Sequence, residues 1–321
     1  MDSQLSRREL IACGGACLMG AIGPVAATAA AAEPQPAAPA VPIRFSLNMG
    51  TLLGHKLPLA EEVEIAAKAG YQGIEPWIRN LQQHVESGRS LSDLRRRIAD
   101  LGLVVENAIG FASWIVDDDA ERAKGLEQLK VEMNLISQLG GRRIAAPPAG
   151  AHDVAGMDLR RIAERYRAIL ELGERLGVTP QLEIWGGSKT LSRMSEAAFV
   201  ATEAAHPNAA VLLDVFHIYK SGSGFAGLKM FSSAAMHVFH VNDYPADPPR
   251  EKATDADRVF PGLGVAPLTT IFRTLCDVGF SGALSLELFN RTYWKADPLT
   301  VARVGLERMQ AAVKRAMAAQ R

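Results

Sequence analysis

The chain has 321 residues, with 35 Lys and Arg against 35 Asp and Glu, so its formal net charge at pH 7 is zero. This balance excludes a field over the whole molecule that would gather nucleic acid or an anionic membrane, although a local basic patch stays compatible with it. The length suits one large domain plus an appendage, since a βα barrel occupies about 250 residues as one unit. From the zero net charge we expect no nucleic-acid partner.

An export signal is predicted at the N-terminus. A Ser-Arg-Arg-x-Leu segment at residues 6–10 directly precedes an apolar run of small residues at 11–32. This order is typical of a secretory signal, and the paired arginines resemble the twin-arginine type. We predict a signal peptide at 1–32 that engages the twin-arginine export machinery, a Pro/Ala-rich linker at 33–42, and a periplasmic or exported protein. The alternative is an uncleaved membrane anchor, because the run approaches the ~20 apolar residues of a span.

From residue 43 onward, short apolar runs rich in β-branched residues alternate with longer amphipathic ones, which predicts parallel strands joined by crossover helices. The predicted strands are 43–49, 73–77, 104–109, 143–146, 181–185, 211–216, 237–241 and 283–289. The predicted helices are 59–69, 91–101, 119–139, 159–176, 194–204, 227–233, 268–278 and 299–317. The first predicted strand is not followed by a nucleotide-binding Gly-x-Gly-x-x-Gly turn, so we predict an α/β fold of the (β/α)8 TIM-barrel class at 43–321 rather than a doubly wound open sheet.

The last four predicted strands each carry a polar side chain near the carboxyl end, in chain order Glu183, Asp214, His240 and Glu287. A βα barrel assembles its functional site at these strand ends. A carboxylate in an apolar strand is costly to bury unless it is paired or bound to a metal. Four such positions in successive strands therefore predict one shared cation.

Three carboxylates and one imidazole suit Mn²⁺, Mg²⁺ or Co²⁺ with open coordination positions, whereas a structural zinc site uses more sulfur and nitrogen. We expect one divalent metal ion, with Mn²⁺ preferred and Zn²⁺ kept as an alternative. Such a metal would polarise a carbonyl group, and its open positions would take two adjacent oxygens of a sugar.

The spacing of the histidines predicts which of them reach the site. Strand residues three apart face opposite sides, so Asp214 and His217 meet at one site only if the chain has left strand geometry by His217. We therefore expect His217 in a loop beside the substrate. The same parity places His237 opposite His240, toward the helix layer, as a structural histidine.

At these residues the chain resembles the xylose-isomerase-like superfamily, which includes ketose 3-epimerases, inosose dehydratases and DNA-repair enzymes of the endonuclease-IV type. The resemblance covers essentially the whole barrel, and its most specific residues are Glu183, Asp214-x-x-His217, His240-x-x-Asp243 and Glu287. It implies that the four residues at the strand ends are the metal ligands and that His217 binds substrate. It also implies that Glu183 and Glu287 form the acid/base pair of the ketose epimerases.

Further substrate contacts follow from the same resemblance and from position. Arg258, in Asp-Arg-Val-Phe-Pro-Gly-Leu-Gly, looks like the substrate-binding arginine of the epimerases. Lys189 stands where those enzymes carry a further glutamate, so we expect different sugar contacts there. Asp243, Trp185 and Glu75 complete the predicted set, with packing as the alternative for Trp185 and a structural hydrogen bond as the alternative for Glu75.

The loop at 244–264 holds several prolines and charged residues, and we interpret it as a lid over the sugar; a plain solvated loop is the alternative. The endonuclease branch uses a histidine-rich site for three metals. With seven histidines, several at unsuitable positions, this chain lacks those ligands.

The resulting hypothesis is a metal-dependent sugar epimerase or isomerase that works through an enediolate. One of Glu183 and Glu287 would remove a proton beside the carbonyl, and the other would return one from the opposite face. Loss of a β-substituent from the same enediolate would instead give a dehydratase or lyase acting on a keto-sugar, keto-glycoside or inosose. A noncatalytic sugar-binding protein and a DNA-repair hydrolase are the alternatives from other classes. The sequence leaves the oligomeric state open, a homo-oligomer included.

Overall fold

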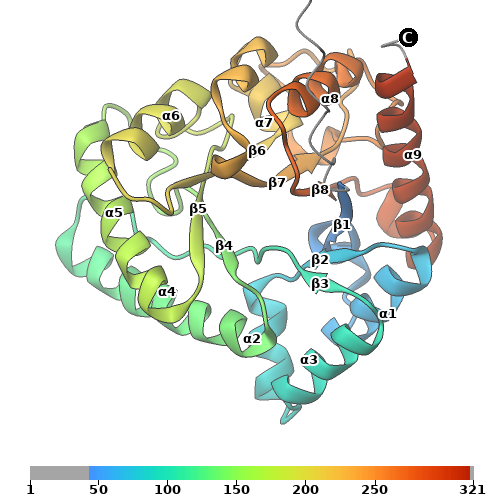
Figure 1. Ribbon diagram of the computed structural model, residues 1–321, viewed down its shortest axis with the longest axis horizontal. Helices are drawn as coiled ribbons and strands as arrows, with labels where there is room; N and C mark the ends of the chain where they lie inside the picture. The colour runs from blue at the N-terminus through green and yellow to red at the C-terminus, as the bar shows by residue number, and fades with distance from the viewer. Residues whose placement is uncertain (1–42, 319–321) are drawn as a thin grey trace, which may run out of the picture. The chain divides into compact units, whose positions relative to one another are not determined.

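The computed structural model describes residues 43–318, and the predicted signal peptide and linker lie outside them. Eight parallel strands form one curled sheet with helices around it, which confirms the predicted TIM barrel (Figure 1). Neighbours in this sheet follow the order β3-β2-β1-β8-β7-β6-β5-β4. The strands are β1 (Arg44–Asn48), β2 (Gly73–Glu75), β3 (Val104–Val105), β4 (Arg143–Ala146), β5 (Thr179–Glu183), β6 (Ala210–Asp214), β7 (Met236–Val241) and β8 (Ala283–Leu286).

The two end strands of this order, β3 and β4, are joined just beyond the short β3. There the backbone N–H of Ala145 donates to the carbonyl of Ala108 at 2.8 Å. An isolated parallel bridge between Trp77 and Ile109 continues the β2 side past the end of β3. The segment after β3 therefore takes part in closing the barrel although it is not regular strand.

The helices lie outside the sheet, and short 3-10 turns follow several strands. The α-helices are α1 (Leu59–Ala69), α2 (Ile78–Glu86), α3 (Leu91–Asp100), α4 (Asp119–Leu139), α5 (Leu159–Leu176), α6 (Met194–Glu203), α7 (Val215–Lys220), α8 (Leu268–Asp277) and α9 (Pro298–Ala318). The 3-10 helices are η1 (Met49–His55), η2 (Phe225–Met230), η3 (Ser233–Ala235), η4 (Asp255–Asp257) and η5 (Tyr293–Lys295). Within 43–318, no helix combines the length and hydrophobicity that crossing a membrane requires.

Helix α5 shows how the helix layer positions the strands that carry the site. The Asp158 side chain accepts from Arg160 N and caps the N-terminus, which satisfies one of the unpaired amides of the first turn. Tyr166 on its buried face lies within hydrogen-bonding distance of the carbonyls of Pro180 (2.9 Å) and Ala210 (2.7 Å). One helix residue thus fixes the starts of both β5 and β6.

The last helix closes the ring of helices. In Figure 1, α9 (red) lies beside α1 (blue), so the first and the last α-helix of the described chain are neighbours. The Tyr71 hydroxyl, just after α1, donates to the Ala302 carbonyl of α9 at 3.0 Å. This contact ties the first βα unit to the last.

One predicted helix was wrong in type and place. The helix predicted at 227–233 is the 3-10 turn η2, and the α-helix after β6 is instead α7, which begins directly at Val215. The sequence prediction also missed α2 and η1. A helix of six residues is too short to display an amphipathic period, and pattern reading depends on that period.

Candidate metal centre

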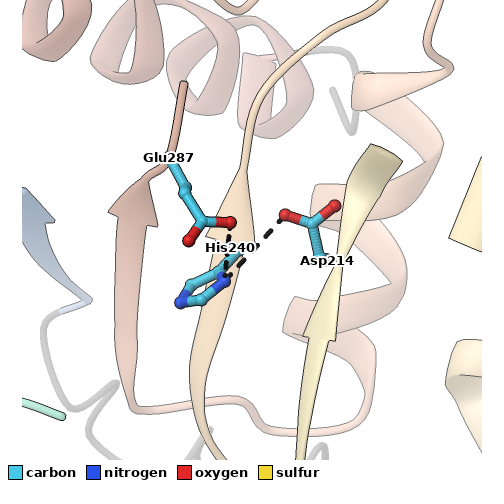
Figure 2. Close-up of side chains that lie close together, drawn as sticks. All are labelled: Asp214, His240 and Glu287. Atoms are coloured by element: carbon cyan, nitrogen blue, oxygen red, sulfur yellow. Dashed lines mark ion pairs between the residues drawn. The ribbon is translucent and has the colours of Figure 1, made fainter. Parts of the chain in front are cut away.

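Three of the four predicted metal ligands converge at the carboxyl ends of β6, β7 and β8 (Figure 2). Strand register brings them together: Asp214 pairs with His240, and His240 pairs with Ser285. Glu287 comes two residues after Ser285, and residues two apart along a strand share one face. All three side chains therefore face the barrel interior.

The ligand atoms of these three residues are close enough to share one ion. His240 Nδ1 lies 3.2 Å from Glu287 Oε2 and 4.0 Å from Asp214 Oδ2. One candidate ligand atom from each residue lies within 4.8 Å of the others, and all three residues are buried. Asp214, His240 and Glu287 thus form a candidate site for a divalent metal.

The donor set fits such an ion. His240 Nδ1 is buried and has no hydrogen-bond partner among the residues of the described chain, although carboxylate oxygens surround it. Burial opposes the charged imidazolium, but the carboxylates of Glu287 and Glu75 raise the pKa of His240 well above its ordinary value. The environment of Nδ1 thus favours positive charge, and a metal ion would take the place of the proton there.

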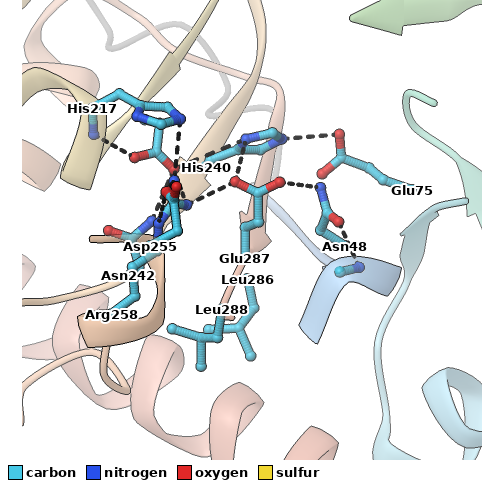
Figure 3. A network of polar contacts seen from close by, with 12 residues as sticks. Asn48, Glu75, His217, His240, Asn242, Asp255, Arg258, Leu286, Glu287 and Leu288 are labelled. Atoms are coloured by element: carbon cyan, nitrogen blue, oxygen red, sulfur yellow. Dashed lines mark hydrogen bonds and ion pairs between the residues drawn. The ribbon is translucent and has the colours of Figure 1, made fainter. Parts of the chain in front are cut away.

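Glu75 holds the other side of the His240 ring. Glu75 Oε2 lies 3.1 Å from His240 Nε2 (Figure 3). The same oxygen accepts from Asn107 Nδ2 at 2.7 Å. A carboxylate behind a ligand histidine fixes the tautomer that leaves the opposite nitrogen free for metal. Glu75 is fully buried and does not line the cavity described below, so its position corresponds to the structural hydrogen bond rather than to the predicted substrate contact.

Two asparagines that the sequence prediction missed orient the carboxylates. Asn48 Nδ2 donates to Glu287 Oε1 at 2.9 Å, and Asn242 Nδ2 donates to Asp214 Oδ2 at 2.8 Å. Both residues offered a signal: Asn48 ends the first strand, and Asn242 lies two residues beyond His240 and so shares its face.

Arg258 reaches the same carboxylates from the loop after β7. Its Nη1 donates to Asp214 Oδ2 (3.0 Å) and Glu287 Oε2 (2.8 Å). Its Nη2 lies 3.1 Å from His217 Nε2 and donates to Asp255 Oδ1 at 2.6 Å (Figure 3). The side chain is only 1% exposed, so this guanidinium is almost fully used within the protein.

His217 lies in the first turn of α7, not in the loop that the sequence predicted. Asp214 Oδ1 accepts from the His217 backbone N–H at 2.7 Å and caps this helix, so the chain leaves strand geometry immediately after β6. Gly186 N–H points at His217 Nδ1 at 3.2 Å. Burial and the charge of Arg258 lower the pKa of His217, which keeps the ring neutral near pH 7.

The two candidate acid/base glutamates differ in charge environment. Burial and the charge of Glu287 raise the pKa of Glu183 to about 8. Burial also opposes ionisation of Glu287, but His240 and Arg258 outweigh it and lower the pKa of that carboxyl. Glu183 is not part of the three-residue ligand cluster, and its Oε2 has no hydrogen-bond partner within residues 43–318. Its role as a fourth ligand stays a prediction.

A cavity of about 370 Å³ opens beside this centre. Its lining residues are Trp77, Ile109, Phe111, His152, Glu183, Trp185, Gly187, Ser188, His217, Asp255, Arg258, Glu287 and Phe289. Five predicted site residues are therefore in the lining, and Asp214 and His240 are fully buried next to it.

Two predicted substrate contacts lie elsewhere. Asp243 is 1% exposed, lies outside the cavity lining and accepts from the backbone N–H groups of Tyr244, Gly262 and Ala266, so it holds the loop at 244–264; its contact with substrate stays a prediction. A Cβ at Gly264 would meet the Tyr244 carbonyl oxygen at 2.2 Å, which explains why the loop needs glycine there. The Lys189 side chain is exposed and outside the cavity lining.

The loop at 244–264 contributes Asp255 and Arg258 to the cavity, as a covering loop would. Its outer turn is held by Lys220 at the end of α7, whose Nζ donates to the carbonyls of Arg250 (3.0 Å), Glu251 (2.9 Å) and Ala253 (2.7 Å). Whether it opens as a lid stays a prediction.

Comparison with known proteins identifies the family. The family model described as xylose isomerase-like TIM barrel matches residues 63–312. Inosose isomerase of Bacillus velezensis is 26% identical over 280 residues, which are 85% of this chain and 98% of that protein. For 3-dehydroshikimate dehydratase of Pseudomonas aeruginosa the identity is 27% over 244 residues, which are 72% of this chain and 36% of the dehydratase. A crystal structure of the IOLI protein with a zinc atom has a TM-score of 0.78 at 22% identity, covering 85% of this chain and 99% of the other. Since the family model matches most of the chain, this protein belongs to the xylose isomerase-like TIM barrel family.

Proposed function

We propose that this protein is a divalent-metal-dependent isomerase or epimerase of a ketose or keto-sugar. The observation that carries the proposal is the three-residue ligand cluster, which lies directly beside a cavity lined by two buried glutamates. The similarity to inosose isomerase over nearly the whole of that protein supports the same reaction class. For the ion we propose Mn²⁺, with Mg²⁺, Co²⁺ and Zn²⁺ as alternatives; the similar IOLI structure carries zinc.

Asp214, His240 and Glu287 would hold the ion, and Glu75, Asn48 and Asn242 would keep these ligands in place. A bound divalent cation supplies Lewis-acid stabilisation for negative charge that develops on a carbonyl oxygen. Aromatic side chains form part of the cavity lining, and an apolar lining strengthens electrostatic contacts beside it.

Glu183 and Glu287 would move the proton. Both line the cavity, and both are buried, so each carboxyl meets substrate without competition from bulk water. One removes the proton from the carbon next to the carbonyl and the other delivers a proton to the opposite face, which inverts that carbon. Delivery to the neighbouring carbon, with proton transfer between the two oxygens, gives isomerisation.

His217 and Arg258 would bind substrate oxygens. Both line the cavity, and Arg258 keeps its charge at every accessible pH. Its N–H groups already point at Asp214, Glu287, Asp255 and His217, so a substrate oxygen would have to replace one of these partners. Gly186 N–H donates to Nδ1 of the neutral His217 ring, which fixes the ring proton on Nε2 and sets the orientation of the ring before a sugar arrives.

A dehydratase is the second candidate, favoured by the similarity to 3-dehydroshikimate dehydratase over 72% of this chain. Elimination begins with the same proton removal and differs in the next step, where a β-substituent leaves. The two candidates are therefore separated by their products rather than by the site.

The test is solvent exchange in D₂O with the full-length protein loaded with Mn²⁺ and offered D-fructose, L-ribulose or an inosose. Isomerisation or epimerisation predicts deuterium in a product that otherwise keeps the substrate's composition, whereas dehydration predicts loss of water. Glu183→Gln and Glu287→Gln should each lower exchange about a hundredfold or more. Glu307→Gln, on the exposed side of α9, is the matched control and should leave exchange unchanged. Exchange that survives both cavity substitutions would contradict the proposal.

We further propose that residues 1–32 direct export through the twin-arginine machinery. Replacement of Arg7 and Arg8 by lysine should retain the protein in the cytoplasm, as measured by fractionation of a bacterial host that has twin-arginine export and expresses the protein. Unchanged export would contradict this proposal.

A further inference from the structure

The cavity has two chemically different halves. Trp77, Phe111, Trp185 and Phe289 form a continuous aromatic wall on one side. Ring centroids are 5.2 Å apart for Trp77 and Phe111, 6.0 Å for Phe111 and Trp185, and 6.0 Å for Trp77 and Phe289. These residues follow β2, β3, β5 and β8, so the wall extends over strand ends on both sides of the barrel mouth. The charged side chains in the lining are Glu183, Asp255, Arg258 and Glu287, and the two parts meet where Arg258 Cζ lies 5.2 Å from the centroid of the Phe289 ring.

This aromatic wall offers few polar partners. Trp77 Nε1 already donates to Asn48 Oδ1 at 3.0 Å, so Trp77 presents only apolar surface to the cavity. Phe111, Phe289 and the neighbouring Ile109 carry no polar side-chain atom. A sugar hydroxyl placed against them would lose its hydrogen bonds to water without replacement, which costs free energy.

The cavity also lacks a free positive charge for an anionic substituent. Arg258 is the sole Lys or Arg in the lining, as far as the described residues extend, and its guanidinium already contacts Asp214, Glu287 and Asp255. A phosphate or carboxylate on the substrate would meet these acidic neighbours without a dedicated partner. The substituent that fits the wall is therefore uncharged.

We propose that the aromatic wall is a subsite for an uncharged planar ring attached to the sugar, so that the preferred substrates are aryl glycosides of a keto-sugar. The inference rests on the proposed function, since it places the reacting sugar beside Glu183 and Glu287. Offset or edge-to-face packing with the wall stabilises an aryl ring beyond the burial of its area. A free ketose leaves the wall unfilled and binds more weakly.

Phe111 is the wall residue best suited to substitution. Its side chain is 41% exposed and has no polar contact, so Phe111→Ala removes ring surface without disturbing the ligand cluster. Met230, 77% exposed on η2 and outside this cavity, provides the matched control Met230→Ala.

The experiment measures binding rather than turnover, by calorimetry of the full-length protein with phenyl β-D-glucopyranoside and methyl β-D-glucopyranoside. These glucosides lack the carbonyl group and so serve as unreactive analogues of a keto-glycoside that differ only in the aglycone. The phenyl glycoside should bind about tenfold more tightly. Phe111→Ala should reduce this preference to about threefold or less, and Met230→Ala should keep it. In saturation-transfer NMR, the aryl protons should receive more saturation than the sugar protons.

Equal affinity for the two glycosides, no binding of the phenyl glycoside, or a preference unaffected by Phe111→Ala would each overturn the subsite. None of these results depends on deuterium exchange, which tests the proposed function. The ring subsite and the reaction can therefore fail separately.

Discussion

The two ring nitrogens of His240 have different carboxylate neighbours: one nitrogen is held by Glu75, and the other faces the candidate metal ligands. Glu75 binds Nε2, while Nδ1 faces the carboxylates of Asp214 and Glu287. His240 could be identified from the sequence because a polar histidine near the end of an apolar strand is costly to bury without a partner. The sequence left Glu75 open between a substrate contact and a structural hydrogen bond, because the pairing of β1 with both β2 and β8, which brings β2 near the site, is a property of the closed sheet.

The Glu75→Gln substitution tests this arrangement. The amide keeps the shape but loses the charge that fixes the imidazole tautomer, so affinity for Mn²⁺ should fall about 10- to 100-fold. Calorimetric titration of the purified protein measures it, with Glu307→Gln as control. Affinity equal to that of the unaltered protein would show that Glu75 does not position His240.

The Glu62 carboxyl, away from the candidate metal centre, should make the free energy of unfolding depend on pH. This α1 carboxyl is 1% exposed, burial raises its pKa to about 7, and Asn80 Nδ2 donates to it at 3.2 Å. The folded protein thus binds this proton more tightly than the unfolded chain. Stability from this group is complete below the unfolded pKa, near 4.5, and is lost as pH rises through about 7, a loss on the order of 3 kcal/mol.

Glu62→Gln removes this ionisation and retains a group of the same shape. Relative to the unaltered protein, the variant should therefore gain stability between about pH 5 and about pH 8. Urea unfolding at both pH values measures the difference. A difference that does not change with pH would mean that Glu62 ionises normally in the folded state.

At the scale of elements, the strand ends were the predictable part of the site and the connections were not. Glu183, Asp214, His240 and Glu287 could be found because polar residues interrupt apolar strands at matching positions. Helix α7 was not predicted because the residue that caps it, Asp214, is also a candidate metal ligand. In the sequence, the signal for a ligand at a strand end hid the signal for a helix start. The contacts between the loop at 244–264 and α7 could not be predicted, because the two segments are distant in sequence and no local sequence pattern connects them.

Lys220 is the clearest of these contacts. Lys220→Met removes an ammonium group that three backbone carbonyls share, and it should free the turn at 249–253 at a cost of about 1–3 kcal/mol in local stability. Limited proteolysis should then cleave this turn faster, while Lys229→Met, an exposed lysine in η2, should have no effect. Equal cleavage of both variants would show that Lys220 does not hold the loop.

Across the whole molecule, the closed sheet turns residues distant in sequence into one site. The barrel class could be predicted from eight strand and helix pairs, whereas the joining of β3 to β4 through an irregular segment could not. A site shared by β6, β7 and β8 also couples metal binding to folding, because the unfolded chain does not preserve it.

Metal binding should consequently stabilise the fold as a whole. At free Mn²⁺ about a hundredfold above Kd, the free energy of unfolding should rise by roughly 2.7 kcal/mol, and a chelator should reverse this. Calorimetric scans measure the shift in Tm. Asp214→Asn should reduce the shift, and an equal shift in this variant would place the bound metal elsewhere.

The most direct test counts the bound ions. In an electron paramagnetic resonance titration with Mn²⁺, the full-length protein should bind about one ion per chain, and His240→Ala and Glu287→Gln should each weaken that binding at least tenfold, while Glu307→Gln should not. Absence of saturable binding, or binding that both substitutions leave intact, would contradict a metal centre formed by Asp214, His240 and Glu287.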